Sequence, residues 1–352
     1  MFLDSLPSTI NDPHPHLGIG DLLSVLRRFD HTIQEETIAP FQLELFDIQS
    51  KIAPDEATFM TTSATIIEKQ LGRLAAQELE RTDSRVGVVV LDRYTPVNAQ
   101  EDIFKLEVSR DINNRQITRP GAVHRPDDQY HLLAKWAARK ELNEIIVMDD
   151  VLGTGSTLIP TLNRIKHDLS DRRIRAITAI ATTGGKVWSG IEKVEQATGI
   201  TTEYTTLLKA SEETLTSTGL SICNSRDMTM LGGYLTAKAN GFRLSVPHFL
   251  PYTVTVPKNI TSPQKRFAAA EHLLDFNDRF IDLLETRADH HLTLQDISDR
   301  GFGVPSTIID AMRKYLPIPR PSTPIKEYLK DTKDVFTRHR SELTYLANAM
   351  RQ

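Results

Sequence analysis

One stretch of the chain decides the fold: Ile145-Ile146-Val147-Met148-Asp149-Asp150-Val151-Leu152-Gly153-Thr154-Gly155-Ser156-Thr157. Its four leading apolar residues predict a buried strand, and two carboxylates follow where that strand reaches the carboxyl edge of a sheet, the usual ligand site of open α/β folds. Gly153 and Gly155 allow the backbone to turn tightly, so that its N–H groups face one point. Ser156 and Thr157 add hydroxyls at the start of the helix that follows. The stretch therefore predicts a strand, an anion-binding loop and a helix.

Buried strands and helices alternate on both sides of this stretch. Near-continuous apolar runs at Val86 to Leu91 and Ile174 to Ala181, bounded by turn residues, predict two more buried parallel strands. Helical spacing is found at about 127 to 141, 157 to 169 and 187 to 198. The βαβ alternation predicts an α/β fold.

Three consecutive segments are expected along the chain. Residues 1 to 84 begin with amphipathic helical patterns and predict an N-terminal helical segment that packs on the core. Residues 85 to 260 are expected to form the α/β domain. Residues 261 to 352 begin with a strongly helical run from 264 to 286 and predict a helical C-terminal region. The proline-rich run from 317 to 324 cannot be helical and would separate two helical pieces of that region.

Composition and charge argue against several classes of protein. The chain of 352 residues has 42 Lys and Arg against 46 Asp and Glu, which does not suggest a dedicated nucleic-acid or membrane-surface protein. The single cysteine, Cys223, excludes an internal disulfide framework and a cysteine-rich metal site, and it fits a reducing compartment. No run approaches the roughly 18 apolar residues of a membrane helix, and the N-terminus lacks a basic start followed by an apolar stretch. We therefore expect a cytoplasmic protein that does not bind or enter membranes.

Two other glycine-rich phosphate motifs fit the loop less well. A Walker A loop, GxxxxGK[ST], needs a lysine before the hydroxyl residue, and this loop has none. The dinucleotide fingerprint GxGxxG needs a glycine where the chain has Leu158, and its acidic residue comes after the helix rather than before the loop. A carboxylate pair directly before a phosphate loop suits a ligand that presents hydroxyls to the acids and a phosphate to the loop. A ribose 5-phosphate does so.

The stretch from 145 to 157 resembles the motif with which the type I phosphoribosyltransferase family binds 5-phosphoribosyl 1-pyrophosphate (PRPP): four apolar residues, two acids, then a Thr-Gly loop. The resemblance is close over about 140 to 185 and looser from 86 to about 250. It implies that Asp149 and Asp150 form the catalytic pair, holding the ribose 2′- and 3′-hydroxyls and favouring positive charge on the sugar. The residues implied to wrap the 5-phosphate are Gly153, Thr154, Gly155, Ser156 and Thr157.

The resemblance also implies a fold and a reaction. The fold would be a central parallel sheet flanked by helices, with the N-terminal helical segment and the all-helical C-terminal appendage added to it. The reaction would be pentosyl transfer in nucleotide metabolism, in which the phosphoribosyl group passes to a nitrogen acceptor, a nucleobase or a related compound, with release of pyrophosphate. Magnesium is implied by PRPP, because this ion usually keeps several waters and binds mainly through substrate phosphates. No metal site made of protein ligands is expected.

Weaker candidates for pyrophosphate contact lie elsewhere. In the family a loop after the first core strand grips pyrophosphate, and here the corresponding residues 91 to 96 lack the usual small residues but include an arginine. Family members also carry a mobile basic lid in the interval that here runs from 105 to 125, although an ordinary surface loop fits its positive excess equally well. Lys186, which follows the strand that ends near 183, would reach pyrophosphate or the acceptor. The Gly184-Gly185 pair before it is equally well explained as an ordinary turn. These candidates are Arg93, Arg110, Arg115, Arg119 and Lys186.

The acceptor is not identified by the sequence. In family members that salvage 6-oxopurines, an aspartate at the position of Gly153 serves as general base. Glycine cannot do so, and a 6-oxopurine acceptor would therefore need a base from elsewhere in the chain.

The C-terminal region leaves the wider role open. The segment from Thr293 to Tyr315 has the sequence pattern of a helix-turn-helix, but its second helix would carry Asp310 as well as Arg313 and Lys314. A hairpin for dimerisation or for docking a protein partner is therefore favoured over nucleic-acid binding. Two alternatives to an enzyme remain: a PRPP-sensing regulator without turnover, and an effector of a bacterial stress or antiviral system, such as the phosphoribosyltransferase-like partners of retrons, acting through a partner or nucleic acid.

Overall fold

The computed structural model describes residues 3, 5–12, 15–30, 32–52, 58–81, 84–91, 102–110, 116–118, 123–183, 189–209, 222–225, 229, 235–239, 242–246, 263–287, 293, 322, 324, 326–327, 330, 337 and 341. The chain divides into two compact units, one made of Met1–Leu17 with Thr62–Ser221 and the other of Gly18–Thr61 with Ile222–Gln352. Each unit thus combines two separated pieces of chain. This division differs from the three consecutive segments expected from the sequence.

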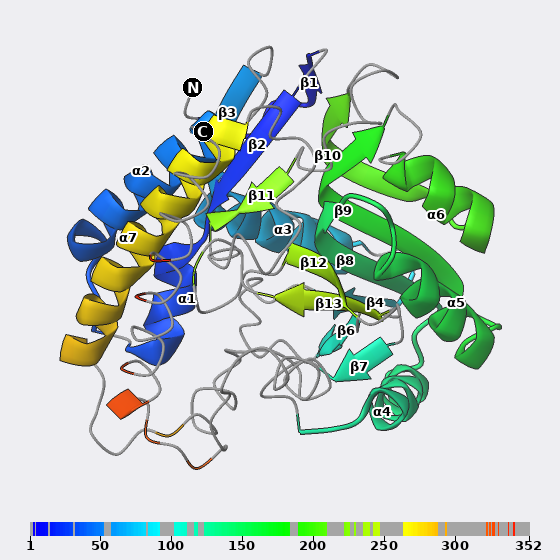
Figure 1. Ribbon diagram of the computed structural model, residues 1–352. Coiled ribbons are helices and arrows are strands. Elements are labelled where there is room, and N and C mark those ends of the chain that lie inside the picture. The colour runs from blue at the N-terminus through cyan, green and yellow to red at the C-terminus, as the bar shows by residue number, and fades with distance from the viewer. Residues whose placement is uncertain are drawn as a thin grey trace. The chain divides into compact units, whose positions relative to one another are not determined.

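The first unit is built on a parallel sheet of six strands in the order β1-β10-β9-β8-β4-β5 (Figure 1). Every neighbouring pair in this sheet is parallel, which confirms the α/β class predicted from the sequence. The strands are β1 (Thr9–Asn11), β4 (Val86–Val90), β5 (Ile103–Lys105), β8 (Glu144–Leu152), β9 (Arg173–Thr183) and β10 (Thr202–Lys209).

Helices cover both faces of this sheet. The first unit has helices α3 (Ala64–Leu79), α4 (Pro126–Arg139), α5 (Leu158–Asp168) and α6 (Gly190–Thr198). Ile145 and Val147 of β8 share one apolar core with α4, α5 and α6, whereas Ile146 and Met148 share the other with α3. Burial on both faces explains why β8 reads as a continuous apolar run. Figure 1 shows α5 and α6 side by side over β8 and β9.

The strand order places a topological switch point between β4 and β8. Along the chain, β4 is followed by β5 on one side, and the next strand of the sheet, β8, then joins β4 on its other side. The segments that leave these two strands therefore run in opposite directions from the carboxyl edge of the sheet. In open α/β sheets, ligands bind in the crevice outside the carboxyl ends at such a point. The acidic end of β8 lies at this position.

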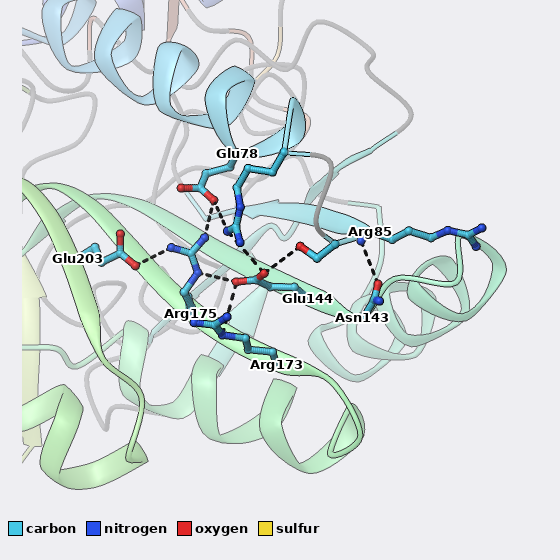
Figure 2. Close-up of polar contacts among 9 residues, drawn as sticks. Glu78, Arg85, Asn143, Glu144, Arg173, Arg175 and Glu203 are labelled. Carbon is cyan, nitrogen blue, oxygen red and sulfur yellow. Dashed lines mark hydrogen bonds and ion pairs between the residues drawn. The ribbon is translucent and has the colours of Figure 1, made fainter.

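An ionic network holds the opposite, amino edge of the sheet (Figure 2). Glu144, at the start of β8, is only 2% exposed and accepts a hydrogen bond of 2.5 Å from Arg175 of β9. Arg175 also pairs with Glu203 of β10 at 2.6 Å and with Glu78 of α3. One guanidinium thus ties two further strands and a helix to β9. Burial lowers the pKa of Arg175, but the hydrogen bonds that it donates to Glu203 and Glu144 outweigh this effect, so the pKa is raised overall.

The second unit contains α1 (Leu22–Phe29), α2 (Glu35–Ile52) and α7 (Pro263–Arg287). It also holds the hairpin β12 (Leu235–Ala239) and β13 (Phe242–Val246), and most residues of a sheet in the order β11-β2-β3, made of Ile222–Asn224, Pro15–Gly20 and Thr58–Ser63. The N-terminal segment therefore has strands as well as the expected helices. None of the described helices is both long and apolar enough to cross a membrane.

The helix α7 agrees with the helical run expected at the start of the C-terminal region, and its partner is α2 (Figure 1). The rings of Phe276 and Phe280 each lie 5.8 Å from the ring of Phe41 on α2. An apolar face of α7 is thus covered within the chain itself. The expected helix-turn-helix and the proline-rich run after it lie almost entirely outside the described residues.

Candidate functional site

The two predicted carboxylates lie near the carboxyl end of β8, which ends at Leu152. Asp149 is buried at 8% exposure, and Asp150 is partly exposed. The Asp150 N–H donates to Asp149 Oδ1 at 3.1 Å, and the Val151 N–H donates to Asp150 Oδ1 at 2.7 Å. Each carboxylate therefore accepts a hydrogen bond from the backbone N–H of the residue that follows it.

The predicted phosphate loop, Gly153 to Thr157, connects β8 directly to α5. Gly155 has a φ of +73°, a backbone conformation that strains any residue with a side chain. A Cβ atom there would also lie 3.0 Å from Cγ2 of Val194 on α6 and 3.1 Å from Cδ1 of Ile159. The hydroxyls of Thr154 and Ser156 bond to each other across this glycine at 2.6 Å. The loop therefore has one compact conformation that glycine permits.

The backbone of this loop presents donors. The Ile159 N–H donates to the Gly155 carbonyl at 2.8 Å, which is the first bond of helical spacing at this end of α5. Within the described part of the chain, the N–H groups of Ser156, Thr157 and Leu158 donate to no other residue. Such groups at the start of a helix, together with the helix dipole, attract an anion. The sequence-predicted anion cradle thus has donors of the required kind.

Thr182 and Gly190 contact the start of the loop. Neither residue was assigned to the site from the sequence. The Thr182 hydroxyl, near the end of β9, lies 3.0 Å from the Leu152 carbonyl oxygen and 2.9 Å from that of Gly153. Gly190, the first residue of α6, approaches so closely that a Cβ atom would lie 2.3 Å from the Gly153 oxygen. The position of Thr182 at the end of a predicted buried strand could have indicated its place at the site. No pattern in the sequence indicated a role for Gly190.

The structure brings together the predicted acids and the predicted loop on one β8-loop-α5 connection. Arg110 belongs to β6 (Val108–Arg110), but its side chain is not among the described ones. In the interval expected to form a lid, Lys105 pairs with Glu107 at 2.8 Å, which reduces the local positive charge. The weaker candidates that lie outside the described residues are Arg93, Arg115, Arg119 and Lys186.

Possible metal ligands are few at this site. Among the described residues, no group of three or more His, Cys, Asp or Glu side chains could hold a metal ion. The carboxylates of Asp149 and Asp150 are oxygen donors of the kind that magnesium accepts. They fit an ion that takes its remaining ligands from a substrate and from water.

A scan against models of known protein families found no match to this chain, and a search of curated proteins found none either. The functional assignment therefore depends on the motif, the strand order and the geometry of the loop.

Proposed function

We propose that the protein is a phosphoribosyltransferase, which binds PRPP with magnesium at the carboxyl end of β8. One observation carries the proposal: at the switch point of a parallel sheet, an acid pair is followed by a glycine loop whose N–H groups at 156 to 158 donate to no described residue. A ribose 5-phosphate matches this order of groups, because its hydroxyls would meet the acids and its phosphate would meet the loop. A dinucleotide or a nucleoside triphosphate would require glycines or a lysine that the loop lacks.

Each group has a chemical role in this proposal. The N–H groups of residues 156 to 158 and the hydroxyls of Thr154 and Ser156 bind the 5-phosphate. Asp149 and Asp150 accept hydrogen bonds from the ribose hydroxyls and stabilise positive charge on the ring as the bond from C1 to pyrophosphate breaks. Pyrophosphate leaves with the electron pair of that bond, a nitrogen of the acceptor bonds to C1, and the proton of this nitrogen passes to water. Magnesium, when bound, would neutralise charge on the pyrophosphate. Pyrophosphate oxygens and the carboxylates of Asp149 and Asp150 would hold the ion.

Pyrophosphate release tests the reaction. The protein, PRPP and magnesium are incubated with each of a panel of nucleobases and related nitrogen heterocycles, and free pyrophosphate is measured. We expect release with at least one acceptor, and its loss in Asp150→Asn. Asp171→Asn is the matched control, because Asp171 is 70% exposed and lies in the turn before β9, away from the carboxyl edge.

The outcomes separate the alternatives. PRPP binding without pyrophosphate release for any acceptor would favour a PRPP-sensing regulator over an enzyme. Neither binding nor release would show that the proposed function is wrong.

A further inference from the structure

A hydrogen-bond relay reaches the phosphate loop from the strand β7 (Gln116–Thr118). The side-chain nitrogen of Gln116 donates to the hydroxyl of Thr161 on α5 at 2.8 Å. The Thr161 hydroxyl in turn donates to the Thr157 carbonyl oxygen at 2.9 Å. Thr157 is the last residue of the loop, so two hydrogen bonds link a side chain of β7 to the loop backbone.

The second bond alone would be unremarkable, because threonine hydroxyls in helices often bond to the carbonyl four residues earlier. Thr198 of α6 does so with the Val194 carbonyl at 2.7 Å. The Thr198 hydroxyl accepts from the nearby Ile200 N–H at 3.1 Å, whereas the Thr161 hydroxyl accepts from a glutamine that lies 45 residues away in the sequence. This added donor fixes the direction in which the Thr161 hydroxyl points its own proton.

The relay is neutral and runs from a half-buried residue into the core. Gln116 is half-buried, Thr161 is fully buried, and Tyr130 of α4 is 2% exposed. The Tyr130 hydroxyl accepts a hydrogen bond from Gln116 Nε2 at 2.8 Å and donates one to Gln116 Oε1 at 3.0 Å. Burial raises the pKa of Tyr130 more than hydrogen bonds from Thr161 and Gln116 lower it, so the hydroxyl keeps its proton. A fully bonded, uncharged network of this kind has one preferred arrangement.

The backbone that carries Gln116 is itself held in place. Its strand pairs with β6, where Arg110 lies opposite Gln116. Gln129 of α4, 4% exposed, accepts from the Glu107 N–H at 2.7 Å and donates to the carbonyls of Glu107 and His124 at 3.2 Å and 2.8 Å. One side chain thus holds positions before β6 and after β7. Gln116 therefore reaches α5 from a supported hairpin.

We propose that Gln116 is a positioning residue for the phosphate loop, acting through Thr161 on the Thr157 carbonyl. The Thr157 carbonyl and the Leu158 N–H belong to one planar peptide unit, so fixing the carbonyl also fixes the direction of that N–H. The proposal rests on the proposed function, since it takes the loop to be the phosphate site. It also gives the interval from 105 to 125 a role beyond its charge, because the hairpin would set the geometry of the loop.

Amide hydrogen exchange without ligand tests the relay by itself. In Gln116→Ala and Thr161→Val, those amides of residues 155 to 159 that are hydrogen-bonded in the wild type, Ile159 among them, should exchange roughly three- to tenfold faster, the effect expected from losing one net hydrogen bond. Thr161→Ser keeps the hydroxyl and should restore the wild-type rate. Thr198→Val is the matched control: it removes a similar buried hydroxyl from α6, but no glutamine donates to it. It should leave these amides unchanged.

Ribose 5-phosphate binding, measured by calorimetry, extends the test to function. Affinity should fall by a similar factor in Gln116→Ala and Thr161→Val, and it should return in Thr161→Ser. Loop exchange that is equal in wild type, Gln116→Ala and Thr161→Val overturns the relay whatever the ligand does. So does a Thr198→Val variant that matches Thr161→Val. A wild-type protein that binds neither ribose 5-phosphate nor PRPP overturns the proposed function, while the exchange data still decide the relay.

Discussion

Replacing Gly190 with alanine should disturb the phosphate loop through direct contact. The added Cβ would lie 2.3 Å from the Gly153 oxygen and 3.0 Å from Leu152 Cγ. Ordinary contact begins near 3.5 Å, so the loop or α6 must move by roughly 1 Å. Overpacking of this kind costs about 1 to 3 kcal/mol of stability. A shift of about 1 Å at a reactive site can cost on the order of a hundredfold in rate.

Gly72→Ala provides the matched control. Gly72 lies inside α3, and a Cβ there would meet no atom within 4 Å. This substitution should raise the free energy of unfolding by about 0.5 to 1 kcal/mol, since alanine favours the helix. Both variants are compared by urea unfolding and by calorimetry with PRPP. If Gly190→Ala unfolds and binds PRPP like the wild type, α6 does not support the loop.

Three further predictions concern stability and assembly. Arg175→Met should lower the free energy of unfolding by about 2 to 3 kcal/mol. This is less than the full cost of breaking a buried pair, because Arg81 and Arg173 remain near Glu144. An unchanged midpoint of urea unfolding would contradict this prediction. Burial raises the pKa of Asp168, but hydrogen bonds from Arg164 and His167 outweigh it, so the pKa is lowered overall. Its contribution is therefore present above about pH 4 and lost as pH falls through the folded-state pKa. Asp168→Asn should show a smaller loss of stability in acid than wild type, whereas parallel curves would refute the coupling. A chain ending before α7 should expose the apolar face of α2 and aggregate or change mass in light scattering; unchanged mass and stability would mean that α7 is dispensable.

The central strands were predictable from the sequence because they are buried on both faces. Continuous apolar runs marked β4, β8 and β9, and the structure has all three. The strand β10 was not predicted, since Thr202–Lys209 contains three threonines and two charged residues and gains its place by pairing with β9. The three-residue strands β1 and β5 are too short to leave a pattern.

The candidate site was predictable where it is continuous in sequence. Asp149 to Thr157 is one local motif, and strand, loop and helix follow in the expected order. The supporting residues Gln116, Thr182 and Gly190 are brought to the loop by tertiary packing, for which periodicity carries no signal. The same holds for α7, whose helical pattern was clear but whose partner α2 lies more than 200 residues earlier.

Calorimetric titration of the wild-type protein with PRPP and magnesium tests the central claim most directly. We predict binding, weakened in Asp150→Asn by about 1.5 to 3 kcal/mol through loss of a charged acceptor. Gly155→Val should abolish binding, because valine cannot adopt the φ of +73° and would meet Val194. Gly72→Val, a matched change in open space on α3, should bind normally. Absence of wild-type binding, or wild-type affinity in both site variants, would contradict the assignment of this loop to PRPP.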